Sequence, residues 1–93
     1  MSQQNIFKLT SAVRIQVVLE HSSPDSVTIE IEDPTDTVKV NYLPMIQLSP
    51  TVYQYIWQSV STDEDGDYLV TIKATWGSYT STDQTTFIME DID

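Results

Sequence analysis

The sequence predicts an all-β protein, an antiparallel sandwich of two sheets with about seven strands. The first reason is composition. Val, Ile and Thr supply 9, 9 and 12 of the 93 residues, and these β-branched side chains fit a pleated strand better than a helix. Ala, the best helix former, occurs only twice,. The second reason is periodicity, because apolar and polar residues alternate with period two along most of the chain, as they do in sheets with one buried face.

Six segments carry this alternation or a continuous apolar run, and each is expected to be a strand. They are residues 13–19, 27–31, 38–42, 53–57, 68–74 and 85–89. Residues 6–9 are a candidate for a short additional first strand. We expect one domain over residues 1–93, with residues 1–5 and 90–93 frayed.

Residues 42–48 are apolar but do not alternate. This pattern favours a crossover from one sheet to the other, with both sides buried. The alternative is an exposed patch that marks an interface. Pro44 lies within this segment and Pro50 follows it, and both would protect a sheet edge from open-ended pairing,.

Turn chemistry separates the predicted strands. Residues 33–36, Asp-Pro-Thr-Asp, suit a type I turn. Residues 21–25 form a polar loop, and residues 63–67 form an acidic loop in which Gly66 is free to take a positive φ. Residues 76–79 connect the last two strands.

Charge and cysteine content exclude several classes of function. Four Lys and Arg stand against 14 Asp and Glu, a net charge of −10, which disfavours nucleic acids and anionic membranes as partners. The absence of cysteine removes disulfides and thiolate chemistry,. No apolar stretch approaches the roughly 20 residues of a membrane span, and we expect no signal peptide at residues 1–5.

Catalytic chemistry is poorly supplied. His21 is the only histidine, and its serine neighbours, Ser22 and Ser23, are adjacent in sequence, whereas triads are assembled from distant segments,. The two glycines cannot form a phosphate-binding loop. The sequence therefore predicts a protein that is not an enzyme and uses no cofactor.

The run Asp-Gly-Asp-Tyr-Leu-Val at residues 65–70 resembles the end of an immunoglobulin-like sandwich, where Gly-x-Tyr-x-Val opens the strand before last. The resemblance extends over roughly residues 27–89. It implies that Gly66 and Tyr68 are structural, with Tyr68 as a tyrosine corner whose hydroxyl binds backbone upstream. Val70 stands where antibody domains have their second cysteine, so the chain is similar to the cysteine-free immunoglobulin-like modules of bacterial surface, macroglobulin-type and phage virion proteins.

Two groups of aromatic residues have two interpretations each. Tyr53, Tyr55 and Trp57 share one strand face, which favours a core stripe, with Trp57 structural, over a platform for carbohydrate stacking. Trp76 and Tyr79 flank the connection at Gly77, and loops at sandwich ends are common recognition sites. We take these two as the candidate partner-binding residues. The alternative for Trp76 is that it caps the core.

The acidic loop also has two interpretations. Asp63, Asp65 and Asp67 carry hard oxygen donors at a density that could hold calcium. Their spacing is not that of an EF-hand, and a solvated turn is the favoured interpretation, so no metal site is assigned.

These observations predict a non-catalytic structural or interaction module that binds protein partners in an assembly. The resemblance suggests a small protein of a phage or other virion, associated with the particle. The alternatives are an extracellular repeat of a bacterial or archaeal adhesin and a carbohydrate-binding module.

Overall fold

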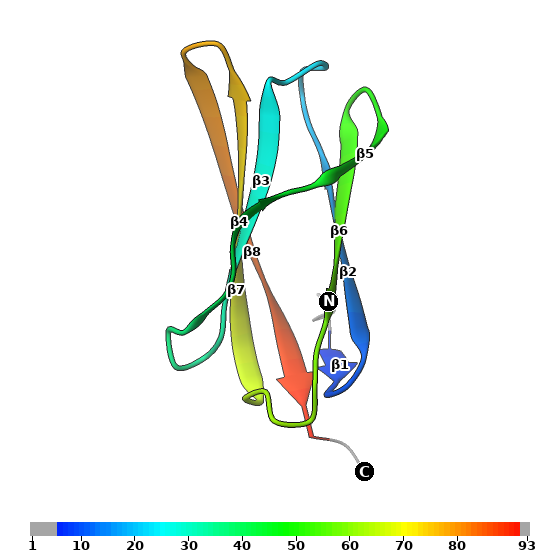
Figure 1. The fold of residues 1–93 in the computed structure, drawn as a ribbon, viewed down its shortest axis with the longest axis vertical. Coiled ribbons are helices and arrows are strands. Elements are labelled where there is room, and N and C mark those ends of the chain that lie inside the picture. Colours follow the sequence, from blue (N-terminus) through cyan, green and yellow to red (C-terminus); the bar gives the residue numbers. More distant parts are fainter. Residues whose placement is uncertain (1–5, 92–93) are drawn as a thin grey trace, which may run out of the picture.

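The structure, a computed structural model, describes residues 6–91 and shows two β-sheets packed against each other (Figure 1). The strands are β1 (Ile6–Lys8), β2 (Ala12–Val18), β3 (Ser26–Glu32), β4 (Val38–Pro44), β5 (Ile46–Ser49), β6 (Val52–Gln58), β7 (Gly66–Trp76) and β8 (Tyr79–Glu90). The larger sheet has the order β1-β8-β7-β3-β4 and the smaller one β2-β6-β5. The predicted all-β sandwich of two sheets is confirmed. The short run near the N-terminus forms β1 as expected, and the eighth strand is β5, which lies in the segment expected to be a crossover.

The structure differs from the sequence expectation at three places. β1 pairs with β8 in parallel, whereas every other described strand pair is antiparallel. β8 begins at Tyr79 and not at residue 85, and its first half was missed because residues 79–84 are exposed on both faces and give no alternation to detect,. Glu90 still pairs with Lys8, so the end expected to fray from residue 90 is ordered at that position. Residues 1–5, 92 and 93 lie outside the described residues.

The part of the chain from residue 6 to residue 91 contains no helix, and therefore none that is long and apolar enough to cross a membrane.

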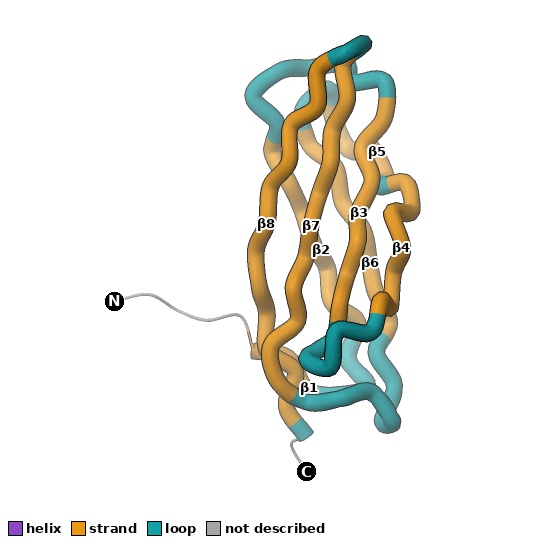
Figure 2. The backbone as a smooth tube through the Cα atoms, turned by 90° about the vertical axis from the view of Figure 1, so that its left-hand side faces the viewer, coloured by secondary structure: helices purple, strands orange, loops and turns teal. Residues whose placement is uncertain are grey.

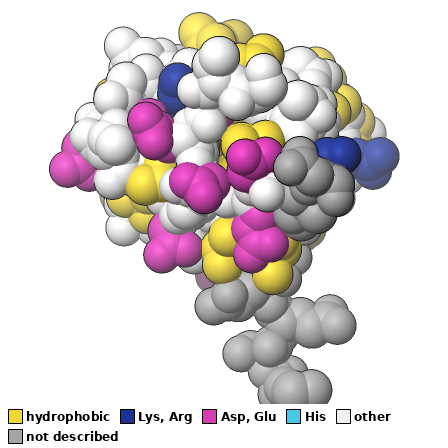
Figure 3. All heavy atoms as spheres, turned by 90° about the horizontal axis from the view of Figure 1, so that it is seen from below, with side chains coloured by type: hydrophobic (Ala, Val, Ile, Leu, Met, Phe, Trp, Pro, Cys, Tyr) yellow, Lys and Arg dark blue, Asp and Glu magenta, His cyan; other side chains and the backbone are white. Residues whose placement is uncertain are grey.

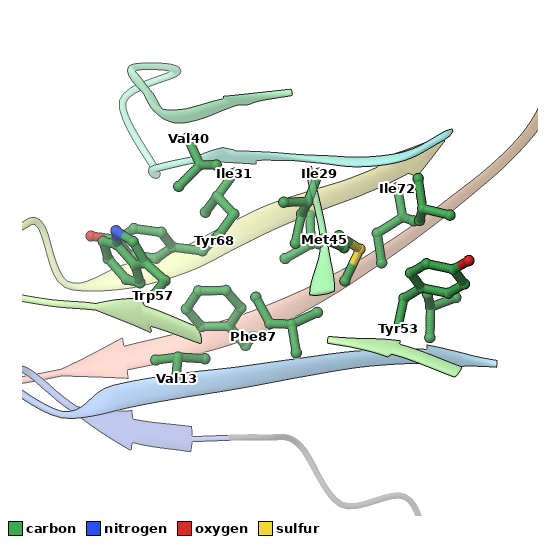
Figure 4. Packing of buried hydrophobic residues seen from close by; sticks show 14 of the residues in the cluster. Val13, Ile29, Ile31, Val40, Met45, Tyr53, Trp57, Tyr68, Ile72 and Phe87 are labelled. Carbon is green, nitrogen blue, oxygen red and sulfur yellow. The ribbon is translucent and has the colours of Figure 1, made fainter. Parts of the chain in front are cut away.

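Three aromatic rings join the two sheets in the core (Figure 4). Tyr68 and Phe87 face each other on β7 and β8, with stacked rings 5.2 Å apart. Trp57, from the smaller sheet, lies 5.4 Å from the Tyr68 ring and 6.1 Å from the Phe87 ring. Such ring pairs stabilise a core beyond the area they bury. The predicted core role of the stripe on β6 is confirmed, since Tyr53 and Trp57 are buried and Tyr55 packs against the same cluster.

One side of the sandwich is closed by the chain itself. Between β4 in the larger sheet and β5 in the smaller sheet, the chain crosses over at Met45, which is buried and donates its backbone N–H to Val27 O at 2.9 Å (Figure 1). The chain therefore crosses between the sheets at residues 42–48 as expected, but the expected burial of both sides is wrong, because Met45 is the only buried residue of this segment. Leu43, Ile46 and Leu48 remain exposed beside it.

The opposite side, between β2 and β8, is closed only over part of its length. β1 pairs with β8 at Ile88 and beyond, and Phe7 packs edge-on against Phe87 with ring centroids 5.8 Å apart. From Tyr79 to Phe87 no strand of the described chain pairs with the outer edge of β8 (Figure 2). The sandwich is thus open along the upper half of this side.

Candidate functional site

The open half of that side forms a groove of about 810 Å³. One wall is the end of β2 and the loop after it, residues 17–21, and the other is Trp76 with the start of β8, residues 79–83. We call this the edge groove. It contains both candidate partner-binding aromatics, so the structure brings Trp76 and Tyr79 into one concave site.

The fold explains why the groove stays open. Buried residues on β7 face inward, and their partners on β8 share that face: Ile72 is opposite Asp83, and Ala74 is opposite Ser81. Asp83, Ser81 and Tyr79 therefore point toward the smaller sheet, yet all three are exposed,. Polar inward-facing residues at an edge keep the smaller sheet from closing over them.

Hydrogen bonds fix the rim of the edge groove. The Asp25 Oδ2 atom accepts from the backbone N–H of Gly77 at 2.6 Å, and the Asp25 N–H donates to Thr75 O at 2.6 Å. The hydroxyls of Ser26 and Thr75 hydrogen-bond at 2.7 Å. The loop after β2 is thereby tied to the β7–β8 hairpin, which makes the groove preformed.

Trp76 and Tyr79 differ in how they are held. Trp76 is partly buried, donates its Nε1–H to Ser22 O at 3.0 Å, and meets the His21 ring edge-on with centroids 6.1 Å apart. The expectation that it caps the core is therefore met, and it also lines the groove. Tyr79 is 78% exposed. The Tyr79 ring is therefore more exposed to a ligand than the Trp76 ring.

The groove carries negative charge. Glu20 and Asp83 line it, and no Lys or Arg is among its lining residues. Val18, 72% exposed, adds an apolar surface beside the carboxylates. This combination suits a ligand with cationic and apolar groups.

The opposite end of the molecule is acidic (Figure 3). Here the β3–β4 turn and the β6–β7 loop meet: Asp63 forms an ion pair with Lys39 at 3.0 Å, and its other oxygen accepts from Val60 N–H at 2.7 Å. The ion pair with Asp63 raises the pKa of Lys39 despite its partial burial. We call these two connections the acidic end.

Asp33 organises the β3–β4 turn as predicted. Its Oδ1 atom accepts the backbone N–H groups of Thr35 and Thr37, each at 2.9 Å, and Asp36 N–H donates to Asp33 O at 3.0 Å. Burial opposes ionisation of the Asp33 carboxyl, but the Thr35 hydroxyl, which donates to Oδ1 at 2.7 Å, the two backbone N–H groups and the charge of Lys39 outweigh it and lower its pKa,.

The calcium candidate is not assembled. Among residues 6–91 no three His, Asp or Glu side chains gather in a way that could hold a metal ion, and Asp63, Asp65 and Asp67 are no exception. Asp63 is engaged by Lys39 and Val60, while Asp65 and Asp67 are exposed.

The structural roles expected of Gly66 and Tyr68 are visible in the same end. The Tyr68 hydroxyl donates to Glu64 O at 2.6 Å, within the predicted loop, and its side chain is fully buried. Burial, followed by the charges of Asp63 and Asp33, raises the pKa of Tyr68 to about 12. Gly66 has a φ of +123°, and a Cβ atom there would lie 3.0 Å from Cγ of Pro34.

Sequence reasoning found the two aromatics of the edge groove but missed its other wall. Val18 breaks the alternation of β2, since it is apolar where a solvent-facing residue is expected. That break in the alternation was the sequence feature that could have indicated this wall of the groove. Thr80, Thr82 and Asp83 carry no signal, because an exposed strand and a polar loop have the same composition.

No family model and no curated protein matches this sequence. Among solved structures, the fold is similar to part of an endo-β-1,4-mannanase from Thermotoga petrophila, with a TM-score of 0.66 and 14% sequence identity. The likeness covers 97% of this chain and 18% of that chain. At this identity it shows a shared fold, and the chain spans only a small fraction of the mannanase.

Proposed function

We propose that this chain is a non-catalytic interaction module that binds a protein partner in the edge groove. The observation that carries the proposal is the preformed groove holding an unshielded Tyr79 next to Trp76 and Val18. Aromatic side chains dominate the energetics of protein interfaces. Loops and edges held by a rigid sandwich are common places for such contacts.

The assembly we propose is a phage or other virus particle, on the strength of the resemblance at residues 65–70. The adhesin repeat is the alternative, and the mannanase likeness bears on it in one respect: the same fold occurs there as a minor part of a longer chain.

Affinity capture tests the proposal. The chain serves as bait, and particles or extracts that contain it are the source of the partner. The captured partner is identified and purified, and its binding to the purified chain is then measured. Tyr79→Ala should weaken rebinding about tenfold or more, since an interface anchor contributes about 2 kcal/mol. The matched control is Ile46→Ala, an exposed apolar residue outside the groove. Equal binding by Tyr79→Ala together with loss in Ile46→Ala would move the contact to the β4–β5 crossover.

Carbohydrate binding is the second candidate. The exposed Tyr79 ring shares the inward face of β8 with the hydroxyl of Ser81 and the carboxylate of Asp83, an arrangement that can stack on a sugar and bind its hydroxyls,. The name of the structural neighbour refers to a mannan-degrading enzyme. Titration with manno-oligosaccharides tests this candidate. Quenching of the tryptophan fluorescence by a glycan, with no protein recovered by capture, would favour carbohydrate binding.

A further inference from the structure

Within residues 6–91, no strand pairs with the upper edge of β8, which lies in line with β1. Tyr79 is opposite Trp76 across the two-residue turn at Gly77 and Ser78, so these two form the hydrogen-bonded pair that closes the hairpin,. Hydrogen-bonded and non-hydrogen-bonded pairs then alternate along β7 and β8. It follows that the N–H and C=O groups of Thr80, Thr82 and Gln84 point away from β7, toward the open side.

The lower part of the same edge shows that these outward groups accept a strand. Glu90, in the same phase as Thr80 and Thr82, accepts the N–H of Leu9 at 2.9 Å as β1 passes along β8. β1 covers only Ile88 to Glu90 on this edge. A further extended segment would continue the line of β1 upward and close the sandwich where it is open.

Charge indicates which segment fits. Asp83 points inward at the unpaired edge, which is one of the ways that proteins prevent their edges from pairing with further copies. Glu20 faces it across the groove. A second copy of this chain, at a net charge of −10, is repelled there, whereas Lys or Arg side chains on alternate residues of a strand would reach both carboxylates,.

We propose that the edge groove takes an extended, basic segment of a partner protein, which adds to the free edge of β8 above β1. The proposal rests on the proposed function and names the form of its partner. Main-chain hydrogen bonds to Thr80, Thr82 and Gln84 supply affinity, and the groove residues Tyr79 and Asp83 select the side chains.

Three synthetic peptides test it against the full-length chain. The first alternates Lys and Val, the second alternates Glu and Val, and the third is the first with alternate backbone nitrogens methylated, which keeps the charge and removes strand pairing. In amide NMR spectra, the Lys-Val peptide is expected to shift the signals of Thr80, Thr82 and Gln84 and to slow their hydrogen exchange. The other two peptides should do neither.

Two variants and a matched control sharpen the test. Thr82→Pro removes an outward N–H on an edge strand, where proline is tolerated, and should weaken Lys-Val binding about tenfold or more. Thr82→Val keeps the backbone donor and should bind as wild type. Asp83→Lys should shift the binding preference of the groove from the Lys-Val peptide toward the Glu-Val peptide. This variant tests the proposal if Thr82→Pro does not fold.

The outcomes separate this proposal from the proposed function. If the methylated peptide binds as well, or if the signals of residues 63–67 shift instead, the attraction is charge alone and strand addition is wrong. If the captured partner is lost with Tyr79→Ala but kept with Thr82→Pro, the groove is the binding site and strand addition is wrong. If neither substitution matters, the proposed function itself fails. A dimer in sedimentation that Thr82→Pro abolishes would make a second copy the occupant and overturn the choice of a basic segment.

Discussion

The two ends of the sandwich use their polar groups in different ways. At the acidic end, two carboxylates and a carbonyl are bound within the chain: Asp33 by its own turn, Asp63 by Lys39, and Glu64 O by Tyr68. At the groove end, hydrogen bonds hold the rim but leave Tyr79 and the edge of β8 exposed. An end whose polar groups are satisfied internally stabilises the fold. An end that is rigid but unsatisfied is the one suited to recognition.

The largest expected difference between the ends concerns the two glycines. Gly66→Ala should lower the free energy of unfolding by about 3 kcal/mol, because an added Cβ meets Pro34 and the φ of +123° is strained for any other residue,. Gly77→Ala should cost about 1 kcal/mol, since its φ of +59° is unfavourable but nothing lies within 4 Å of a new Cβ,. Urea unfolding of both variants measures this. Equal costs would show that Pro34 moves aside freely.

The next difference concerns the two side-chain tethers. Tyr68→Phe should cost about 1–2 kcal/mol, because Glu64 O loses its donor next to a fully buried ring,. Trp76→Phe removes a bond to Ser22 O in an exposed setting, where water replaces the donor, and should cost about 0.5 kcal/mol through hydrogen bonding,. Thermal unfolding of the pair tests the comparison. An unchanged melting temperature for Tyr68→Phe would contradict a tyrosine corner.

Alkaline pH should act through the acidic end. The pKa of Tyr68 is raised from 10 to about 12 in the folded protein, so its contribution to stability is complete below pH 10, the value in the unfolded chain. Above that, the unfolded state ionises first and the contribution is lost as the pH approaches 12. The difference in the free energy of unfolding between wild type and Tyr68→Phe should therefore shrink between pH 10 and pH 12. Urea unfolding of both proteins at each pH measures this difference. A constant difference would mean that the Tyr68 pKa is the same in both states.

Much of the fold follows from the sequence because burial imposes period two. Residues such as Val27, Ile29 and Ile31 alternate with polar neighbours, and β3 forms where they predict it. Gly66 was identified from its freedom to take a positive φ, and the role of Tyr68 from the resemblance of residues 65–70 to the end of an immunoglobulin-like sandwich. The first half of β8 was not predicted, since both of its faces are exposed and no residue preference marks such a strand.

The candidate site was predictable only in part for a related reason. Tyr79 and Trp76 stand out as aromatics beside a glycine turn. The groove itself depends on where β1 stops along β8 and on which strands form the two edges. Those are properties of sheet order, which local patterns do not encode.

Salt should stabilise the acidic end slightly. Exposed like charges interact over about 10 Å at 0.1 M ionic strength, so added NaCl should raise the melting temperature, and CaCl₂ at equal ionic strength should raise it no further. Asp65→Asn at the acidic end should reduce the salt effect more than Asp83→Asn at the groove end, each by a few tenths of a kcal/mol. A rise specific to millimolar calcium would restore the metal site that the positions of Asp63, Asp65 and Asp67 argue against.

The last comparison, between Tyr79 and Trp76, separates recognition from folding. Tyr79 is 78% exposed and makes no side-chain hydrogen bond within the described residues, so Tyr79→Ala should change the free energy of unfolding by no more than about 0.5 kcal/mol. Trp76→Ala, by contrast, removes a ring packed against the core and a bond to Ser22 O, and should cost about 2 kcal/mol. Urea unfolding gives both values. Because an exposed aromatic that does not stabilise the fold has no structural reason to be there, a neutral Tyr79→Ala makes it the clean probe of binding in the edge groove. A loss of unfolding free energy comparable with that of Trp76→Ala would instead show that Tyr79 supports the hairpin. A binding defect of Tyr79→Ala would then have to be compared with that of Thr82→Pro.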